Sequence, residues 1–480
     1  MSFIPANRRR PLTAININNE FAVQGDSLQP YRVLFIGPKG TGNAVVGQVT
    51  KINSLGDAAT KLGRGSAAYD FAKGFFAQKS GHELNVLVVD DASLTARVAT
   101  LTFGGVATEA KTLALYVGGL RVAVNVDSGA TAAQVATNVA SALNAQTELA
   151  FTAVATGAVV ALTSRNKGLF TNDIMVENSR GEGEALPAGI TLAKAETTPG
   201  AGVPTTLPLS AVDANTQYIL LSTCFNDAAT LGLIKTELEN RNDPTRKVDG
   251  YNISAKYGNS AELTALGTMF NSQFISIFPA VGGSTESYLS GAIVGQTARV
   301  KANDPAASVR GVELLGAAQA LNSEVLSDSQ LNTLLLNGVS SYNVSLGKVR
   351  LDLLATTYRT DSDGQTDVSY FDLSVLLVLS YLRYDLDRLS AQRFAGAKIG
   401  RDGVNYDENQ KIVTEKSIEA EIINIFDSWE ERGLIEDRAA FRRSLSVMRN
   451  ASDVNRVDIV LRPNVVNELR ILGYDIQFIL

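Results

Sequence analysis

The chain has 480 residues, of which 45% are hydrophobic and 19% are charged, and its formal net charge is −6. This composition is sufficient for two or three packed domains, and it gives no general reason to expect a nucleic acid as partner, because phosphate binding needs a basic surface. The single cysteine excludes an internal disulfide framework and any metal site built from several cysteines.

Two chemically special residues have ordinary surroundings. Cys224 lies in the apolar segment YILLSTCF, so we expect a small buried core residue and not a nucleophile. The only histidine, His82, lies in the polar segment QKSGHEL, where we expect an exposed loop residue. A catalytic triad or a zinc site would need partners that the composition barely supplies.

The N-terminus, MSFIPANRRRP, carries charge but no apolar core of signal-peptide length. The most apolar later candidate, residues 371–382, contains Asp372, Ser374 and Ser380 and is shorter than the roughly 20 apolar residues of a membrane span. We therefore expect no membrane insertion and a protein that is made and assembled in the cytoplasm.

Residues 1–23 have the character of an arm. Prolines and three consecutive arginines discourage regular packing, whereas residues 12–17 have strand propensity. This short segment can pair with a partner, or it can be the first edge strand of its own domain.

The next elements predict an α/β core. Residues 32–37 form a buried-type strand, residues 66–78 a helix capped by Ser66, and residues 84–91 a second strand. The loop PKGTGNA between them lacks the spacing of a phosphate loop, since Lys39 is misplaced, and we interpret it as a glycine-rich turn. Asp90 and Asp91 are expected to be a solvated pair at a strand end.

Small residues dominate from about 93 to 208, which indicates a separate inserted module. Residues 113–126 predict a hairpin that turns at Gly118 and Gly119, residues 131–146 a helix, and residues 149–164 a second hairpin that turns at Thr156 and Gly157. The stretch from 165 to 208 is interpreted as loop and return linker.

Strands and helices alternate again after the insertion. Residues 218–223, 248–254 and 273–279 are predicted strands, and the helix after the first of them is capped by Asp227. Residues 304–347 are expected to be a loop-rich connection with one short helix near residues 327–336.

The last third contains two long predicted helices. The first, residues 369–393, carries Arg383, Arg388 and Arg393 at near-helical spacing, which favours either a basic face aimed at an acidic partner or a solvated face near a helix C-terminus. The second begins at Thr414 and ends at Arg432.

The C-terminal segment VNRVDIVLRPNVVNELRILGYDIQFIL predicts a strand, a short helical turn over residues 463–469 and a final strand over residues 475–480. A terminus this apolar is a poor solvated tail. We expect it to be buried in its own fold or added to the sheet edge of a neighbour.

Several segments together make the chain similar to contractile tail sheath proteins of bacteriophages, of the Mu-like kind. The most specific ones are ATTYRTDSDGQTDVSYFDLSVLLVLSYLRYDL, RFAGAKIGRDG, the helix from Thr414 to ERGLIED, and NASDVNRVDIVLRPNVVNELRILGYDIQFIL. GPKGTGN, KLGRGS and LNVLVVDD resemble the sheath core, and VNVDSGATAAQVATNVASALNA with ALTSRNKGLFTNDI resembles a domain often inserted there. One departure is Glu415 after Thr414, where such proteins often have proline.

The resemblance implies a multidomain tail-sheath fold with a mixed α/β core, an inserted β-rich domain and extended terminal arms. The domains would be an N-terminal arm at 1–23, a core at 24–92 and 209–345, the insertion at 93–208, a C-terminal sheath domain at 346–474 and an arm strand at 475–480.

It also implies a structural, non-enzymatic subunit without cofactor that contracts to drive a tail tube through the host envelope. Expected partners are further copies in stacked hexameric rings, the tail tube protein, and baseplate and tail terminator proteins, in a virion assembled in the host cytoplasm. The arms would add strands to neighbouring subunits, and the three arginines would contact the tube. The arm residues are Leu12, Ala14, Ile15, Ile17, Ile476, Gln477, Phe478, Ile479 and Leu480. The sheath of a tailocin or another injection device, and an α/β enzyme, are the alternatives.

Overall fold

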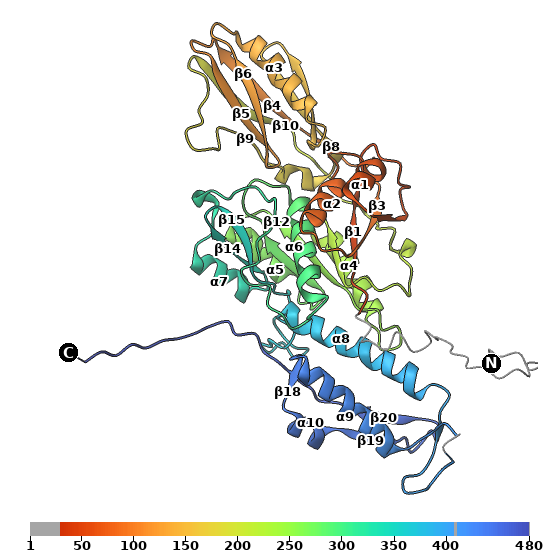
Figure 1. Ribbon diagram of the computed structural model, residues 1–480. Helices are drawn as coiled ribbons and strands as arrows, with labels where there is room; N and C mark the ends of the chain where they lie inside the picture. Colours follow the sequence, from red (N-terminus) through yellow and green to blue (C-terminus); the bar gives the residue numbers. More distant parts are fainter. Residues whose placement is uncertain (1–28, 408–409, 480) are drawn as a thin grey trace, which may run out of the picture.

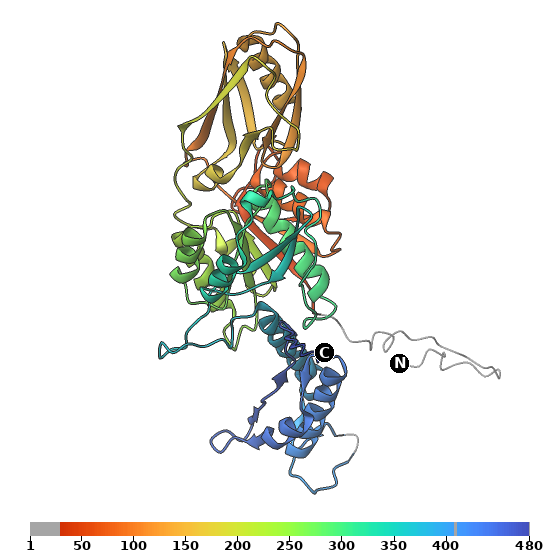
Figure 2. The ribbon, with the colours of Figure 1, turned by 90° about the vertical axis from the view of Figure 1, so that its left-hand side faces the viewer.

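The computed structural model describes residues 29–407 and 410–479. Three parts are stacked along the long axis of the molecule, and they remain stacked when the view is turned by 90° (Figures 1 and 2). The insertion lies at one end, the α/β core in the middle and the C-terminal domain at the other end (Figure 1).

The core is a six-stranded sheet with the order β13-β12-β11-β1-β3-β2, in which only the edge strand β2 is antiparallel to its neighbour. Its five parallel strands are buried along nearly their whole length, as expected for a sheet covered on both faces. They are β1 (Arg32–Pro38), β2 (Val49–Ile52), β3 (Glu83–Val89), β11 (Leu220–Thr223), β12 (Tyr251–Lys256) and β13 (Ile275–Pro279). The mixed α/β fold predicted from the sequence is confirmed.

The chain winds away from β1 in both directions, which places α2 and α6 on one face and α4 and α5 on the other. Ser66 and Asp227 cap α2 and α4 as predicted. The helices of the core are α1 (Leu55–Leu62), α2 (Ala67–Ala77), α4 (Ala228–Arg241), α5 (Ser260–Met269), α6 (Glu286–Lys301) and α7 (Asp328–Leu336), with a hairpin of β14 (Ser341–Ser345) and β15 (Lys348–Leu353) and short 3-10 turns at Leu209–Ala211 and Asn322–Glu324.

Helix α6 is the main element that the sequence pattern did not predict. All of its residues except Arg299 and Val300 are buried, so the helix has no polar stripe that would reveal its period. It crosses α2 closely because glycines lie at the contact: a Cβ on Gly291 would be 2.1 Å from the Phe71 carbonyl oxygen, and a Cβ on Gly74 would be 2.1 Å from that of Tyr288.

The insertion packs a four-stranded and a three-stranded antiparallel sheet with α3 around its own apolar cluster. Both predicted hairpins and the predicted helix are present. The loop expected over residues 165–208 is wrong in part, because Ile190–Thr198 forms the nine-residue strand β10 that pairs along β4. The elements are β4 (Ala96–Gly105), β5 (Lys111–Val117), β6 (Leu120–Val126), α3 (Ala132–Ala145), β7 (Phe151–Thr156), β8 (Val159–Lys167), a 3-10 turn η1 (Leu169–Asp173), β9 (Val176–Asn178) and β10.

The C-terminal domain packs helices α8 and α9 around Trp429 and Phe426. Thr414 caps α9 as predicted, so glutamate at position 415 does not disturb the cap. The helical turn expected over residues 463–469 is wrong, since Asn464–Val465 pairs with Ile435–Glu436 as a strand. The elements are α8 (Leu373–Leu389), a π-turn η4 (Ser390–Phe394), β16 (Lys398–Ile399), β17 (Ile412–Val413), α9 (Glu415–Glu431), β18 (Ile435–Glu436), α10 (Arg438–Ser444), β19 (Ser446–Arg449), β20 (Val457–Val460) and β21 (Asn464–Val465).

Candidate functional site: the C-terminal tail and its surroundings

The last described residues, 471–479, extend away from the body of the molecule as an isolated, extended segment (Figure 1). No hydrogen bond joins them to the rest of the described chain. Their apolar side chains are nearly fully in solvent: Ile476 is 85% exposed, Phe478 78% and Ile479 99%. Exposed apolar surface of this extent in one segment is typical of an unoccupied interaction site.

Between Ile471 and Ile479, residues 472–478 of the tail have the two-residue period of a strand with one apolar face. Leu472, Tyr474, Ile476 and Phe478 alternate with Gly473, Asp475 and Gln477. In an extended chain alternate side chains point to opposite sides, so the first set forms one apolar face. Such a face becomes buried when the chain adds to a sheet that has a core beneath it.

The sequence predicted a strand over residues 475–480 and left two locations for it. Within one chain the described part of this segment, residues 475–479, pairs with no strand. The expectation that the segment is buried in its own fold is wrong, because the side chains of its described residues are exposed, namely Ile476, Gln477, Phe478 and Ile479. Leu480 lies outside the described residues, as do Leu12, Ala14, Ile15 and Ile17 of the N-terminal arm. Addition to a neighbour therefore stays a prediction for both arms.

The free part of the tail begins earlier than the sequence suggested. The backbone N–H of Val466 still donates to Leu434 O (3.2 Å), Arg470 pairs with Asp372, and Arg310 donates to Arg470 O (2.9 Å). Among the described residues, no hydrogen bond or ion pair joins the tail to the body after Arg470. The signal for this boundary was the apolar alternation itself, which continues toward the N-terminus through Tyr474 to Leu472.

Two short strand pairs in the C-terminal domain offer open edges. β18 pairs only with β21, and β19 only with β20, among the described residues. Met448, Ile459 and Val460 on the second pair are exposed. Two-stranded ribbons are marginally stable alone and present unpaired backbone groups, so an added strand would complete them.

The three arginines of the predicted basic face do not form one surface. Arg383 donates to Asp249 Oδ1 (2.7 Å) and Asn242 Oδ1 (2.8 Å), which links α8 to the core. Arg388 donates to Asp385 Oδ1 (2.7 Å), one turn earlier on the same helix. The Arg393 side chain is 63% exposed, and among the described residues its ion-pair partner is Glu421, at 3.8 Å. The solvated-face interpretation is wrong for Arg383, and only Arg393 lies open to a partner.

The glycine-rich loop does not form a phosphate site. Its backbone N–H groups at Gly40, Asn43 and Ala44 donate to the carbonyls of the last turn of α1, at 2.7–3.1 Å, and Lys39 Nζ donates to Gly42 O. A Cβ on Gly42 would lie 2.1 Å from the Lys61 carbonyl oxygen, so the glycine is needed for close packing. The interpretation as a turn agrees with this geometry.

The insertion covers the edge of the sheet at which α/β enzymes bind ligands, namely the carboxyl ends of the strands. Phe170 packs edge-on against Phe225 just after β11, with ring centroids 5.4 Å apart. Asn166 binds Ala67 N (2.9 Å) and Lys39 O (2.8 Å), and the Asp91 carboxylate accepts from Asn166 and from Lys167 N, both at 2.9 Å. The expectation of a solvated pair is therefore wrong for Asp91, which fixes the insertion.

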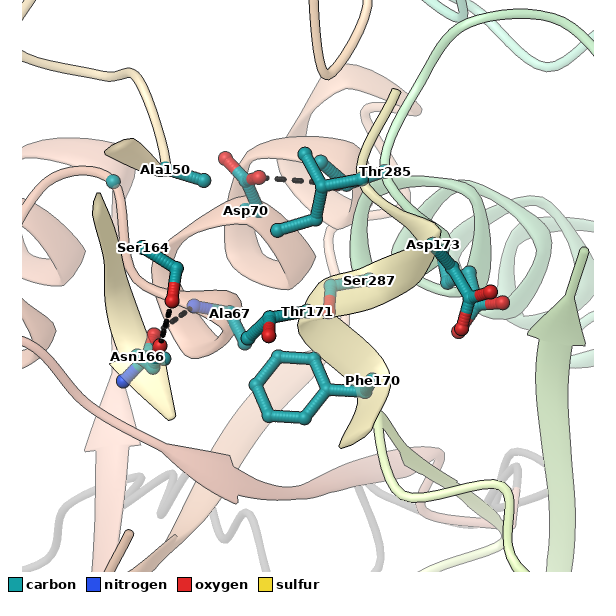
Figure 3. Close-up of a pocket in the computed structure, with 13 residues that line it drawn as sticks. Ala67, Asp70, Ala150, Ser164, Asn166, Phe170, Thr171, Asp173, Thr285 and Ser287 are labelled. Carbon is teal, nitrogen blue, oxygen red and sulfur yellow. Dashed lines mark hydrogen bonds between the residues drawn. The ribbon is translucent and has the colours of Figure 1, made fainter. Parts of the chain in front are cut away.

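A cavity of about 20 Å³ lies at this seam between the insertion and the core (Figure 3), and a second cavity of about 110 Å³, lined by Leu149 and Tyr288, adjoins Asp70 at the same seam. Asp70 accepts from Thr285 Oγ1 (3.0 Å), and burial raises the pKa of its carboxyl to about 6. The cavity of about 20 Å³ has room for one water molecule but not for a substrate. Of the polar side chains around it, Asn166 bonds across to the core, whereas Ser164 and Thr171 bond within the insertion.

Cys224 and His82 take no part in a catalytic or metal site built from the described residues. Cys224 is fully buried as expected, and burial raises the pKa of its thiol. His82 is half-buried beside Tyr31, so the expectation of an exposed loop residue is wrong; burial lowers the pKa of its imidazole.

Within residues 29–407 and 410–479, the acidic, histidine and cysteine side chains form no cluster suited to a metal ion. No helix in the same residues combines the length and the apolarity that a membrane crossing requires.

Comparison with known proteins gives the fold and the family. The family described as Phage tail sheath C-terminal domain matches residues 365–479, which include the tail. Among solved structures, a sheath tail protein from Desulfitobacterium hafniense covers 95% of this chain and 100% of its own, with a TM-score of 0.50 and 14% identity. The sheath of an extracellular contractile injection system in its contracted state covers 99% and 98%, with a TM-score of 0.50 and 8% identity.

A full-length relative decides the assignment. The Mu-like prophage FluMu tail sheath protein of Haemophilus influenzae is 32% identical over 482 residues, which is 99% of each chain. This likeness spans the insertion and the tail as well as the core. The chain therefore belongs to the phage tail sheath family, whose members are structural subunits of contractile tails and not enzymes, and it is a component of a phage particle.

Proposed function

We propose that this subunit polymerises by tail exchange: residues 471–480 leave one copy and add a strand to an open ribbon edge in the C-terminal domain of the next. The observation that carries the proposal is the apolar face of Leu472, Tyr474, Ile476 and Phe478, which is exposed in the single chain. The N-terminal arm, residues 12–17, would make the corresponding contact with another neighbour.

The free energy of strand addition favours a stable lattice whose subunits can still move relative to one another. About five backbone hydrogen bonds at roughly 1 kcal/mol net each, together with burial of four apolar side chains at about 1.5–3 kcal/mol each, offset the cost of ordering the tail. Every subunit repeats the contact, so the polymer is far more stable than one pair. The extended tails stay connected while the compact domains change position.

The polymer would be a helical sheath of stacked hexameric rings that surrounds the tail tube protein and ends at baseplate and terminator proteins, and it would assemble in the host cytoplasm. A signal from the baseplate would release an extended, high-energy lattice into a compact one and drive the tube through the envelope. No nucleotide is needed for this work, since new contacts between subunits supply it.

We further propose that the tube contact is electrostatic and that Arg393 belongs to it. Arg383 and Arg388, the other two residues of the original basic face, are bound to carboxylates of their own chain. Charge reversal at Arg393 should weaken sedimentation of the sheath with tube at low salt. Unchanged docking would remove Arg393 from the tube contact.

A tailocin or another injection device is the second candidate, because the contracted injection-system sheath shares this fold. Both candidates use the same subunit contacts. The presence or absence of capsid genes beside the coding sequence separates them.

Tail exchange is tested by changing one face of the tail at a time. Replacement of Ile476 and Phe478 by serine removes apolar burial from the proposed buried face and should abolish polymers that negative-stain microscopy detects in the unaltered protein. The matched control replaces Asp475 and Gln477, on the opposite face, by serine and should preserve polymers. Equal effects of the two pairs would contradict a one-sided strand.

A further inference from the structure

The root of the tail, where residues 468–470 leave the body, contains a cluster of charged groups from three parts of the chain. Lys301 ends α6, Asp372 precedes α8 as its N-terminal cap, and Glu468 and Arg470 belong to the tail root. Lys301 is 1% exposed, and the side chains of Asp372 and Glu468 are 8% and 13% exposed. Lys301 and the two carboxylates therefore lie largely out of water, whereas the Arg470 side chain is 39% exposed.

The two carboxylates of the cluster, Asp372 and Glu468, differ in their hydrogen-bond partners. Asp372 accepts from Ser374 N (2.7 Å) through Oδ1 and from Arg470 through Oδ2. Glu468 Oε2 lies 3.9 Å from Arg470 Nε, and Glu468 Oε1 is buried without a hydrogen-bond partner among the described residues. One carboxylate thus holds the guanidinium while the other is only partly paired. A buried charge in this condition is unfavourable, and a second position of the guanidinium would relieve it.

The surroundings allow such a second position. A cavity of about 230 Å³ adjoins Asp372, Ser374, Glu468 and Arg470, so the guanidinium has room to turn. Lys301 Nζ donates to Ser374 Oγ (2.8 Å), beside Asp372. Burial lowers the pKa of Lys301, and the negative charges of Asp372 and Glu468 oppose that effect. Lys301 is therefore placed to balance Asp372 when Arg470 leaves it. Arg310 donates to Arg470 O through a side chain that is 57% exposed, so this bond can follow a movement of the main chain at Arg470.

We propose that the tail root is a two-position ionic latch. Arg470 sits on Asp372 in one position and on Glu468 in the other, and Lys301 balances the carboxylate that is left. The position of Arg470 sets the direction in which residues 471–480 leave the subunit. The latch rests on the proposed role of the tail and adds a means by which the tail turns without leaving a buried charge unpaired.

The test measures the tail direction in dilute, unpolymerised protein. Spin labels at Asn303→Cys and Tyr474→Cys, in a Cys224→Ala background, report the distance between the end of α6 and the tail by pulsed electron resonance. Asp372→Asn keeps a helix-capping side chain but removes the charge that holds Arg470, and should shift the main distance. Glu468→Gln removes the second position and should leave one narrow distance near that of the unaltered chain.

Asp475→Asn is the matched control, since this carboxylate lies in the free tail and contacts only Gln477. It should leave the distance distribution unchanged. Identical distributions for Asp372→Asn, Glu468→Gln and the unaltered chain would overturn the latch, and so would an equal shift with Asp475→Asn. The distance measurement needs no polymer, so it tests the latch alone. The microscopy experiment tests tail exchange, and either proposal can fail without the other.

Discussion

Trp429 on α9 donates its indole N–H to Asp385 Oδ2 on α8 at 2.9 Å, and this bond ties the two long helices of the C-terminal domain together. Both residues are buried. Arg388 pairs with the other oxygen of the same carboxylate. The domain that carries the tail thus depends on a polar contact inside an otherwise apolar cluster.

Replacement of Asp385 by alanine should destabilise the C-terminal domain by about 3 kcal/mol, because a buried indole N–H and a guanidinium lose their acceptor. Denaturant unfolding followed by Trp429 fluorescence measures this. Asp387 is also on α8, and Asp387→Ala, which removes only its exposed ion pair with Lys247 of the core, should change stability by at most about 1 kcal/mol. Similar losses for the two variants would contradict the assigned role.

The contact between α2 and α6 predicts a strong effect of one methyl group. Gly291→Ala places a Cβ against the Phe71 carbonyl oxygen and should cost about 1–3 kcal/mol of stability, because backbone cannot move aside easily. Gly232→Ala in α4 meets no atom within 4 Å and should instead stabilise by up to about 1 kcal/mol. Thermal unfolding compares the two, and the same sign for both would contradict the packing.

The seam between the insertion and the core should respond to pH through Asp70. Its pKa is raised by burial from 3.8 to about 6 in the folded chain, although Lys73 and Thr285 oppose the shift. The folded state therefore binds the proton more tightly, and the contribution of Asp70 to stability falls as pH rises from about 4 to about 6.

Asp70→Asn removes this titration. The stability of the variant minus that of the unaltered chain should rise between pH 4 and pH 7, by an amount on the order of 2 kcal/mol. Urea unfolding at several pH values measures the difference. A constant difference across this range would show that Asp70 does not carry the effect.

The predicted boundaries of the insertion, residues 93–208, are tested by excision. Thr95 and Ala201 exchange backbone hydrogen bonds of 2.9 and 3.3 Å, so the two connections run side by side. Replacement of residues 96–200 by Asn-Gly should leave a cooperatively folding core with a lower Tm, since the Asn166 and Asp91 contacts are lost. Loss of core circular dichroism at low temperature would show that the core depends on the insertion.

The parts that were predicted from the sequence are those whose local pattern agrees with their final surroundings. Strand β1 is a continuous apolar run, the hairpin of β5 and β6 turns at two glycines, and Ser66 and Thr414 cap their helices. In each case the signal lies within a few residues of the chain.

The missed parts depend on distant contacts. Helix α6 is buried on all sides, so its sequence shows no polar face. The sequence of β10 is largely polar and lacks a strand pattern, because pairing with β4 orders this strand. The partners of Arg383, namely Asn242 and Asp249, lie more than 130 positions away along the chain. The tail was recognised as a strand, but its start was placed at residue 475; the apolar alternation back to Leu472 indicated an earlier start, and the contacts of Arg470 with Asp372 and Arg310 mark where the free part begins.

The central claim, that the exposed tail joins subunits, is tested most directly by sedimentation and electron microscopy of the full chain beside a version that lacks residues 471–480. We expect tubes or rings from the full chain and only single subunits, with unchanged circular dichroism, from the shortened one. Polymers of the same form and amount from the shortened chain would contradict tail exchange.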